Sequence, residues 1–355
     1  MKIYKRYFIY LAVFAFLTLL FHIFKHLRPV MNAVTNALVP VKRALSWICD
    51  ITALSVAEFL IAAAIIFALY YIVKSVVLII KSENRLPVFL KRLLGALCGI
   101  ITVYFGMALM LGTTYYSDSF QEKSGLYARG GTVDELYSVA GLFAEKATET
   151  GALVSRDENG VFNVPLDTIF ENSKGIYKGA EQEFPTLSGP DRRPKKVILS
   201  RLMSYFNNTG FYFPFTAEAN INIDCPLAFI PATIAHEFAH QRGVAAEQEA
   251  NFAAIIACIT SGKPEYEYSG WLLGYIYLVN ALYSRDYDKF VEVYGILSDE
   301  VMADIIANNE YWAQFETPVS EISDKVYDEF LKGYGQELGV QSYGAVVDLL
   351  LAYFR

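Results

Sequence analysis

The chain of 355 residues is poor in histidine and cysteine, with four of each. The cysteines (Cys49, Cys98, Cys225 and Cys258) show no C-x-x-C spacing, so neither a disulfide framework nor a cysteine-based zinc site is indicated. A bridge between Cys225 and Cys258 stays open, without positive support. Charged residues are also scarce, at 19%, whereas hydrophobic residues make up 54%, too many for an ordinary soluble domain of this size. The composition predicts a membrane protein.

The hydrophobic excess is concentrated near the N-terminus, in three apolar runs at 7–24, 59–80 and 93–115. Each run is long enough to cross about 30 Å of hydrocarbon as a helix. The first could instead be a cleaved signal peptide, but its apolar stretch is long and no A-x-A-like site follows it. We therefore predict three transmembrane helices in a membrane region at 1–116, with the lipid bilayer as a partner. Residues 25–50 are expected to form a short helical connector near the membrane surface.

The sign of the net charge changes at the end of the third apolar run. Residues 1–115 contain 12 Lys+Arg and 3 Asp+Glu, a net of +9. The other 240 residues carry 18 (30 − 12) Lys+Arg and 34 (37 − 3) Asp+Glu, a net of −16. An acidic domain argues against nucleic acid as a partner. Residues 117–355 are enough to bury a core of their own.

The basic residues near the spans indicate a topology. With a cytoplasmic N-terminus, eight basic residues lie inside and six lie outside near the membrane. The positive-inside rule therefore modestly favours a multi-pass protein of the cell membrane whose acidic domain is extracytoplasmic. The eight are Lys2, Lys5, Arg6, Lys74, Lys81, Arg85, Lys91 and Arg92, and the six are Lys25, Arg28, Lys42, Arg43, Lys123 and Arg129.

The acidic domain has a mixed pattern in which helix predominates. The segments "KVILS", "GFYFPF" and "ANINID", within 196–224, are β-branched or aromatic and separated by turn residues, which predicts strands. The chain after residue 226 is expected to be helical. There, "YSGWLLGYIYLVNALYS" is apolar but short and follows the acidic "KPEYEY", so a buried core helix is predicted instead of a fourth span. The fold class expected is α+β, mostly helical, with a small β-sheet.

One short segment, "HEFAH", holds two of the four histidines. On a helix, His236 and His240 project from one face, so both imidazoles can reach one ion. Glu237 lies beside the first histidine, where its carboxylate can reach a metal-bound water without being a ligand. This is the H-E-x-x-H arrangement, two nitrogen ligands with an adjacent general base. Gly243 is placed to end the helix as a C-cap.

The alternative is a solvated polar helix face whose histidines pair with nearby acids. Ile234, Ala235, Phe238 and Ala239 make this stretch largely apolar, a poor setting for an idle His-Glu-His. We therefore predict metal binding, with Zn²⁺ as the cofactor.

The third ligand has to be an acid or Cys258, because the only other histidines, His22 and His26, lie at the end of the first span. Glu247 and Glu249 compete, and they lie about 200° apart around a helix, so only one can face the ion. Glu247 is favoured because Asn251 follows one turn later on the same face, where it can hydrogen-bond a ligand histidine. One turn beyond Glu249 lies Ala253, which offers no such bond.

The whole pattern resembles a known family. The features are "SVAE" at the second span, "GFYFPFTAEANINIDCP" before "AHEFAHQRG", then "EQEANFAAIIAC", "YSGWL" and the terminal "SYGAVVDLLLAYFR". Together they resemble a family of bacterial multi-pass membrane proteins, domain of unknown function 3810. The resemblance covers nearly the whole chain and implies a zincin-like metallopeptidase domain at 117–355.

These observations predict a membrane-anchored zinc metallopeptidase. A zinc-activated water, with Glu237 as general base, would hydrolyse peptide bonds of a peptide or protein substrate. A strand at 219–223 is expected to pair with an extended substrate, and Tyr268 and Tyr343 are candidates for stabilising the oxyanion. The rival hypothesis is a non-catalytic membrane sensor or assembly protein with a structural metal site. Such sites usually have a fourth protein ligand, which is not evident here.

Overall fold

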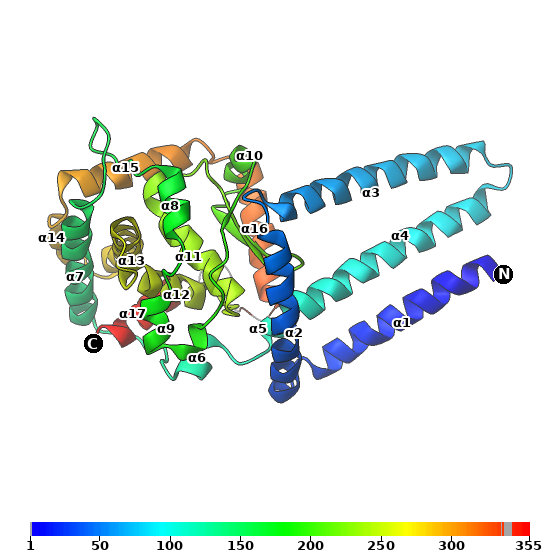
Figure 1. Ribbon diagram of the computed structural model, residues 1–355, viewed down its shortest axis with the longest axis horizontal. Helices are drawn as coiled ribbons and strands as arrows, with labels where there is room; N and C mark the ends of the chain where they lie inside the picture. The colour runs from blue at the N-terminus through cyan, green and yellow to red at the C-terminus, as the bar shows by residue number, and fades with distance from the viewer. Residues whose placement is uncertain (1, 335, 337–342) are drawn as a thin grey trace. The chain divides into compact units, whose positions relative to one another are not determined.

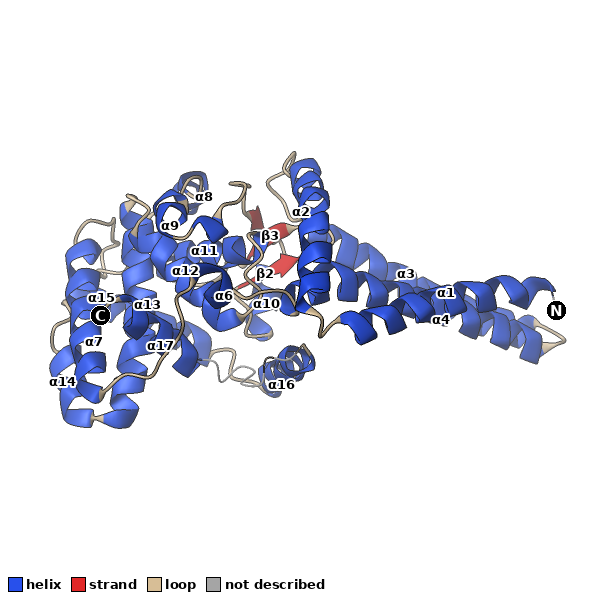
Figure 2. Ribbon diagram, turned by 90° about the horizontal axis from the view of Figure 1, so that it is seen from below, coloured by secondary structure: helices blue, strands red, loops and turns tan. Residues whose placement is uncertain are grey.

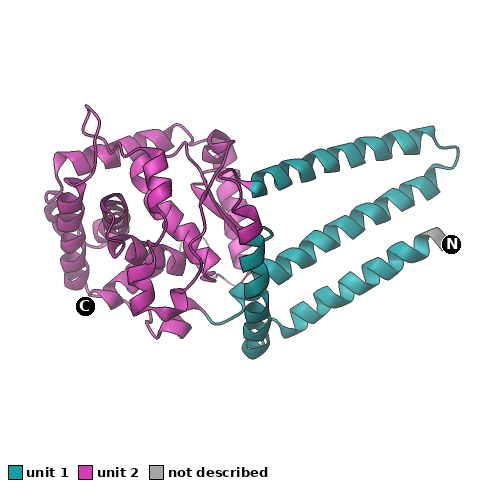
Figure 3. Cartoon of the chain, viewed as in Figure 1, with its two compact units in different colours: residues 1–45, 56–118, 214–216 teal, residues 46–55, 119–213, 217–355 magenta. Residues whose placement is uncertain are grey.

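The computed structural model describes residues 2–334, 336 and 343–355, and its chain divides into two compact units (Figure 3). Unit 1 comprises residues 1–45, 56–118 and 214–216, and unit 2 comprises 46–55, 119–213 and 217–355. The main boundary falls after residue 118, two residues beyond the one expected.

The regular elements in the described residues of unit 1 are all helices (Figure 1). Its elements are α1 (Lys2–Phe24), α2 (Arg28–Cys49, of which residues 46–49 group with unit 2), α3 (Val56–Lys81), α4 (Arg85–Met107), the π-helical η1 (Ala108–Gly112) and α5 (Thr113–Tyr115).

Three stretches of the described residues are long and apolar enough to cross a membrane: Tyr4–Phe24, Val56–Lys81 and Arg85–Tyr115. This agrees with the prediction of a protein with three apolar membrane helices. The third begins at Arg85, before the expected residue 93, because lysine and arginine are good helix formers and hydropathy locates only the apolar part of a helix. The connector expected at 25–50 contains α2.

Unit 2 is also mostly helical and contains one small sheet (Figure 2). Its remaining elements are α6 (Phe120–Ser124), α7 (Val133–Gly151), α8 (Leu166–Asn172), α9 (Lys178–Glu183), η2 (Pro185–Leu187), β1 (Lys195–Lys196), α10 (Ser200–Tyr205), β2 (Gly210–Phe213), β3 (Glu218–Ile221), η3 (Leu227–Phe229), α11 (Ile230–Gln241), α12 (Glu247–Ile259), α13 (Pro264–Arg285), α14 (Tyr287–Tyr294), α15 (Asp299–Ala313), α16 (Pro318–Gly333) and α17 (Tyr343–Tyr353).

The core of unit 2 is built around α13, which packs against α7, α11 and α12. Tyr266, Leu272, Tyr275 and Leu278 of α13 are all at most 1% exposed. The apolar stretch that resembled a fourth span is therefore a buried core helix, as predicted. Its apolar residues face protein on several sides, which accounts for its hydrophobicity.

The sheet has the order β1-β3-β2, with β1 parallel and β2 antiparallel to β3. In its register, Lys195 pairs with Asn220, and Gly210 pairs with Ile221. The expectation that the strand at 219–223 pairs with a substrate is wrong, because β3 is the central strand and has a neighbour on both sides. Such pairing requires an edge strand, and the edge beside α11 is β2.

Residues 46–55 group with unit 2 because they are tied to its sheet. Lys195 is buried, and its Nζ donates hydrogen bonds to Cys49 O at 2.7 Å and Thr52 O at 2.5 Å. Ser55 Oγ donates to Asn220 Oδ1 on β3 at 2.6 Å. A buried ammonium group needs such acceptors, so these contacts also satisfy the lysine.

Candidate metal centre

The H-E-x-x-H segment lies on α11, whose apolar face is buried in the core. Ile234, Ala235, Phe238 and Ala239 are all fully buried, which fixes how the helix is rotated about its axis. The helix ends at Gln241, and Gly243 follows its C-cap residue as expected, with a φ of +85° in the left-handed region that favours glycine. The turn at Gly243 sends the chain back toward α11, and α12 packs against it.

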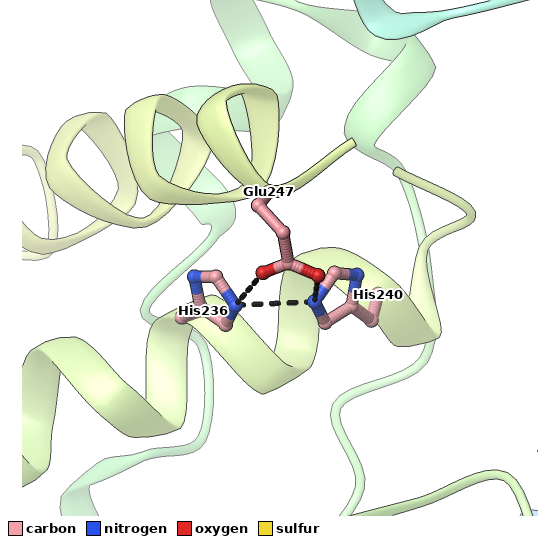
Figure 4. Close-up of side chains that lie close together, drawn as sticks. All are labelled: His236, His240 and Glu247. Atoms are coloured by element: carbon pink, nitrogen blue, oxygen red, sulfur yellow. Dashed lines mark hydrogen bonds and ion pairs between the residues drawn. The ribbon is translucent and has the colours of Figure 1, made fainter. Parts of the chain in front are cut away.

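Three side chains from these two helices converge (Figure 4). His236 Nε2 lies 3.2 Å from Glu247 Oε2, and His240 Nε2 lies 3.7 Å from Glu247 Oε1. The two Nε2 atoms lie 3.1 Å apart. Glu247 is the first residue of α12, so its carboxylate extends from the start of that helix over the histidine face of α11.

The other nitrogen of each imidazole is engaged with an oxygen atom. His236 Nδ1 lies 2.8 Å from Asn251 Oδ1, and His240 Nδ1 lies 2.8 Å from Val244 O. Both partners are acceptors, so each Nδ1 carries a proton and donates. In the neutral tautomer, each Nε2 then holds a lone pair directed into the cluster. Two lone pairs and a carboxylate repel one another unless positive charge lies between them.

The donor set and its spacing fit zinc. A tetrahedral Zn²⁺ with bonds of about 2.0–2.1 Å separates its ligand atoms by about 3.3 Å. Here the two Nε2 atoms lie 3.1 Å apart, with that of His236 3.2 Å from Glu247 Oε2 and that of His240 3.7 Å from Glu247 Oε1. The side chains of His236, His240 and Glu247 are only 12–16% exposed, so the cluster is largely screened from water but still accessible.

The electrostatics of the cluster call for a positive charge. Burial lowers the pKa of His240, but the Glu247 carboxylate more than offsets this and raises that pKa to about 9. Burial raises the pKa of Glu247, but the two histidines outweigh it and hold that pKa well below its usual range. The carboxylate is therefore ionised at neutral pH, and a proton and a divalent cation compete to neutralise it.

Glu237 is not one of the three clustered residues, and its side chain packs against the start of β2. It is 3% exposed, and its Oε2 has no hydrogen-bond partner in the part of the chain that the structure describes. Its other oxygen lies against the start of β2, since a Cβ at Gly210 would be 2.9 Å from Glu237 Oε1. Burial raises the pKa of Glu237, which the two histidines partly oppose. The result is a carboxyl group with an uncommitted oxygen beside two imidazoles.

The two competing glutamates have different surroundings. Glu249 is only 2% exposed, and its carboxylate accepts hydrogen bonds from Phe120 N at 2.8 Å and Gln121 Nε2 at 3.0 Å. It therefore caps α6 and points away from the histidines. Glu247 faces them, and Asn251 makes the contact with His236 that the spacing predicted.

Cys258, the other alternative for a third ligand, is fully buried and its Sγ lies 3.9 Å from Pro231 O, outside the group. Tyr268 also lies elsewhere, because its buried hydroxyl donates to Asp304. The expectation that Tyr268 stabilises the oxyanion is therefore wrong. The side chain of Tyr343 lies outside the described residues.

Two tyrosines near the cluster escaped sequence reasoning. Tyr212, on β2, has its ring 6.4 Å from the His240 ring, and burial raises its pKa. Tyr327, on α16, donates a hydrogen bond from Oη to Glu247 Oε1 at 2.8 Å. Neither follows from spacing, because both reach the cluster through tertiary packing, although "GFYFPF" marked the strand that carries Tyr212.

The family model described as Protein of unknown function (DUF3810) matches residues 35–351. No curated protein and no solved structure matches the chain.

Proposed function

The chain belongs to the DUF3810 family, whose description assigns no activity, and from the site we propose that it is a membrane-anchored, zinc-dependent metallopeptidase. The observation that carries this proposal is the convergence of His236, His240 and Glu247 beside a buried carboxyl group, Glu237, that has an uncommitted oxygen. Unit 2 would then be a zincin-like domain, with its two-helix ligand set on α11 and α12.

In this proposal the zinc ligands are His236, His240 and Glu247. When bound, zinc would supply Lewis acidity, which activates water and polarises the scissile carbonyl. The protein prepares the ligands through their outer contacts. Asn251 and Val244 O hold the Nδ1 protons of the two histidines, which fixes the tautomer that presents both Nε2 lone pairs.

Glu237 moves the protons of the reaction. Its Oε2 accepts a proton from the attacking water and later delivers it to the nitrogen of the leaving amine. Burial supports this role because it raises the pKa of Glu237, and a carboxylate with a raised pKa is a stronger base. Gly210 supports it as well, since the lack of a side chain there leaves room for the carboxylate.

The substrate would bind as an extended strand along β2. Among the described residues, β3 is the only strand that pairs with β2, and β2 packs against α11. A peptide added at this edge would run past the two histidines. Tyr212, whose ring lies beside that of His240, would contact the side chains of the peptide.

A purely structural metal site is less well supported. Structural zinc sites usually have four protein ligands, whereas the ligand group in the described residues has three. The buried Glu237 Oε2, which has no hydrogen-bond partner in the described residues, also costs free energy of folding. A purely structural metal site has no use for such a group.

Zinc removal and return test the proposal. The full chain in detergent micelles is incubated with a broad peptide library, and cleavage is followed by mass spectrometry. We expect cleavage that a chelator abolishes and added zinc restores. A chain that holds zinc but cleaves no peptide would instead support the structural role.

A further inference from the structure

Tyr327 brings a hydroxyl group to the metal-ligand cluster from a distant part of unit 2. Its Oη donates to Glu247 Oε1 at 2.8 Å, although 80 residues separate the two in sequence. The residue is 42% exposed, so a molecule that approaches the cluster from solvent can also reach this ring. Buried core tyrosines of unit 2, such as Tyr268, do not combine these two properties.

The helix that carries Tyr327 is held at several points. Thr317 caps the start of α16, and Leu331 near its end is 1% exposed. Between them, Ser323 Oγ donates to Phe206 O at 2.9 Å. Ser323, one turn before Tyr327, and the buried Leu331, one turn after it, hold this part of α16 against the rest of unit 2.

A peptidase needs a donor for the oxygen of the scissile carbonyl, because negative charge builds there as water attacks. The ion pairs of Glu247 in the described residues are with His236 and His240, and no lysine or arginine pairs with it. Neither histidine has a ring nitrogen left for the substrate, because each Nδ1 contacts a protein oxygen and each Nε2 faces the Glu247 carboxylate. Tyr327 places a neutral donor, its hydroxyl group, beside the Glu247 carboxylate.

We propose that Tyr327 is a catalytic residue whose hydroxyl donates a hydrogen bond to the scissile carbonyl oxygen as charge develops on it. The proposal rests on the peptidase function proposed above. Both oxygens of Glu247 face the histidines, so a cation in the cluster draws on their charge and weakens their bond to the hydroxyl. The hydroxyl then turns to the substrate oxygen and keeps its proton throughout.

The test compares Tyr327→Phe with Tyr205→Phe in the full chain. Tyr205 is a matched control, because it is 43% exposed but packs its ring against Phe315, away from the ligand group. Zinc affinity is measured by chelator competition. Kinetics use a peptide that the wild type cleaves, and calorimetry measures the binding of phosphinic peptides, whose tetrahedral phosphinate mimics the charged oxygen.

We expect Tyr327→Phe to keep the zinc affinity of the wild type. Its kcat and its affinity for phosphinic peptides should fall on the order of 10²-fold, with little change in KM. Tyr205→Phe should behave as the wild type in all three measurements.

Two results would overturn the proposed role of Tyr327 and leave the proposed peptidase function standing. Weaker zinc binding with normal kcat and phosphinic-peptide affinity at saturating zinc would mean that Tyr327 only orients Glu247. No change in any measurement would mean that it has no role. If the zinc-loaded wild type neither cleaves peptides nor binds phosphinic peptides, the proposed peptidase function itself is wrong, and this proposal with it.

Discussion

Asn251→Ala is expected to weaken zinc binding although Asn251 is not a ligand. Its Oδ1 accepts the Nδ1 proton of His236 at 2.8 Å, which holds the ring with Nε2 toward the cluster. Without this acceptor the ring can rotate, and its tautomer is no longer fixed. The buried N–H also loses its partner.

The size of the effect follows from how such outer contacts behave in metal sites. Loss of a hydrogen bond to a ligand histidine typically lowers metal affinity 10- to 100-fold, which is about 1.4–2.7 kcal/mol. A ligand that binds only the folded state stabilises it in proportion to the logarithm of the ratio of ligand concentration to Kd, once that ratio is large. At a fixed excess of zinc, the stabilisation that zinc adds should therefore fall by the same 1.4–2.7 kcal/mol, roughly.

The assay is a chelator-competition titration together with chemical denaturation, with and without zinc. The difference between the two denaturation curves removes any effect of the substitution on the metal-free fold. Gln248→Ala is the control, because Gln248 lies on the same helix but has no hydrogen bond to either histidine. Equal zinc affinities for Asn251→Ala and the wild type would refute the reasoning.

Three further predictions concern the ligand choice, the turn and the topology. Glu247→Gln should weaken zinc binding far more than Glu249→Gln, and the reverse ranking in a chelator titration would contradict the assignment. Glu249→Gln should mainly lower the free energy of unfolding, by about 1 kcal/mol, because Glu249 caps α6. Gly243→Ala should lower the free energy of unfolding by about 1–2 kcal/mol, because φ there is +85°, and an unchanged denaturation midpoint would count against this. A reporter fused after Tyr116 should be active outside the cytoplasm, and activity solely inside would reverse the proposed topology.

Much of the architecture could be read from local sequence patterns. Long apolar runs indicated the three membrane helices, and the short run on α13 could be assigned to the core because acidic residues precede it. The arrangement of the candidate metal site was also local, since the four-residue spacings His236–His240 and Glu247–Asn251 each define one helix face. The turn at Gly243 then brings those two faces together.

The features that sequence reasoning missed depend on contacts between distant segments. The strand at 219–223 looked available for a substrate, but Lys195 and Lys196 pair with one side of β3 and β2 with the other. Tyr268 looked like a plausible oxyanion donor until packing placed its hydroxyl on Asp304. No periodicity connects Tyr327 with Glu247, because α16 reaches the cluster only through the fold.

The most direct test of the central claim is a side-by-side measurement of zinc content and peptide hydrolysis in the wild type and Glu237→Gln. The substitution keeps the size of the side chain but removes the base. We predict stoichiometric zinc and normal folding in both proteins, with hydrolysis lowered on the order of 10³-fold or more in the variant. A variant that loses its zinc, or one that cleaves peptides as fast as the wild type, would contradict the account.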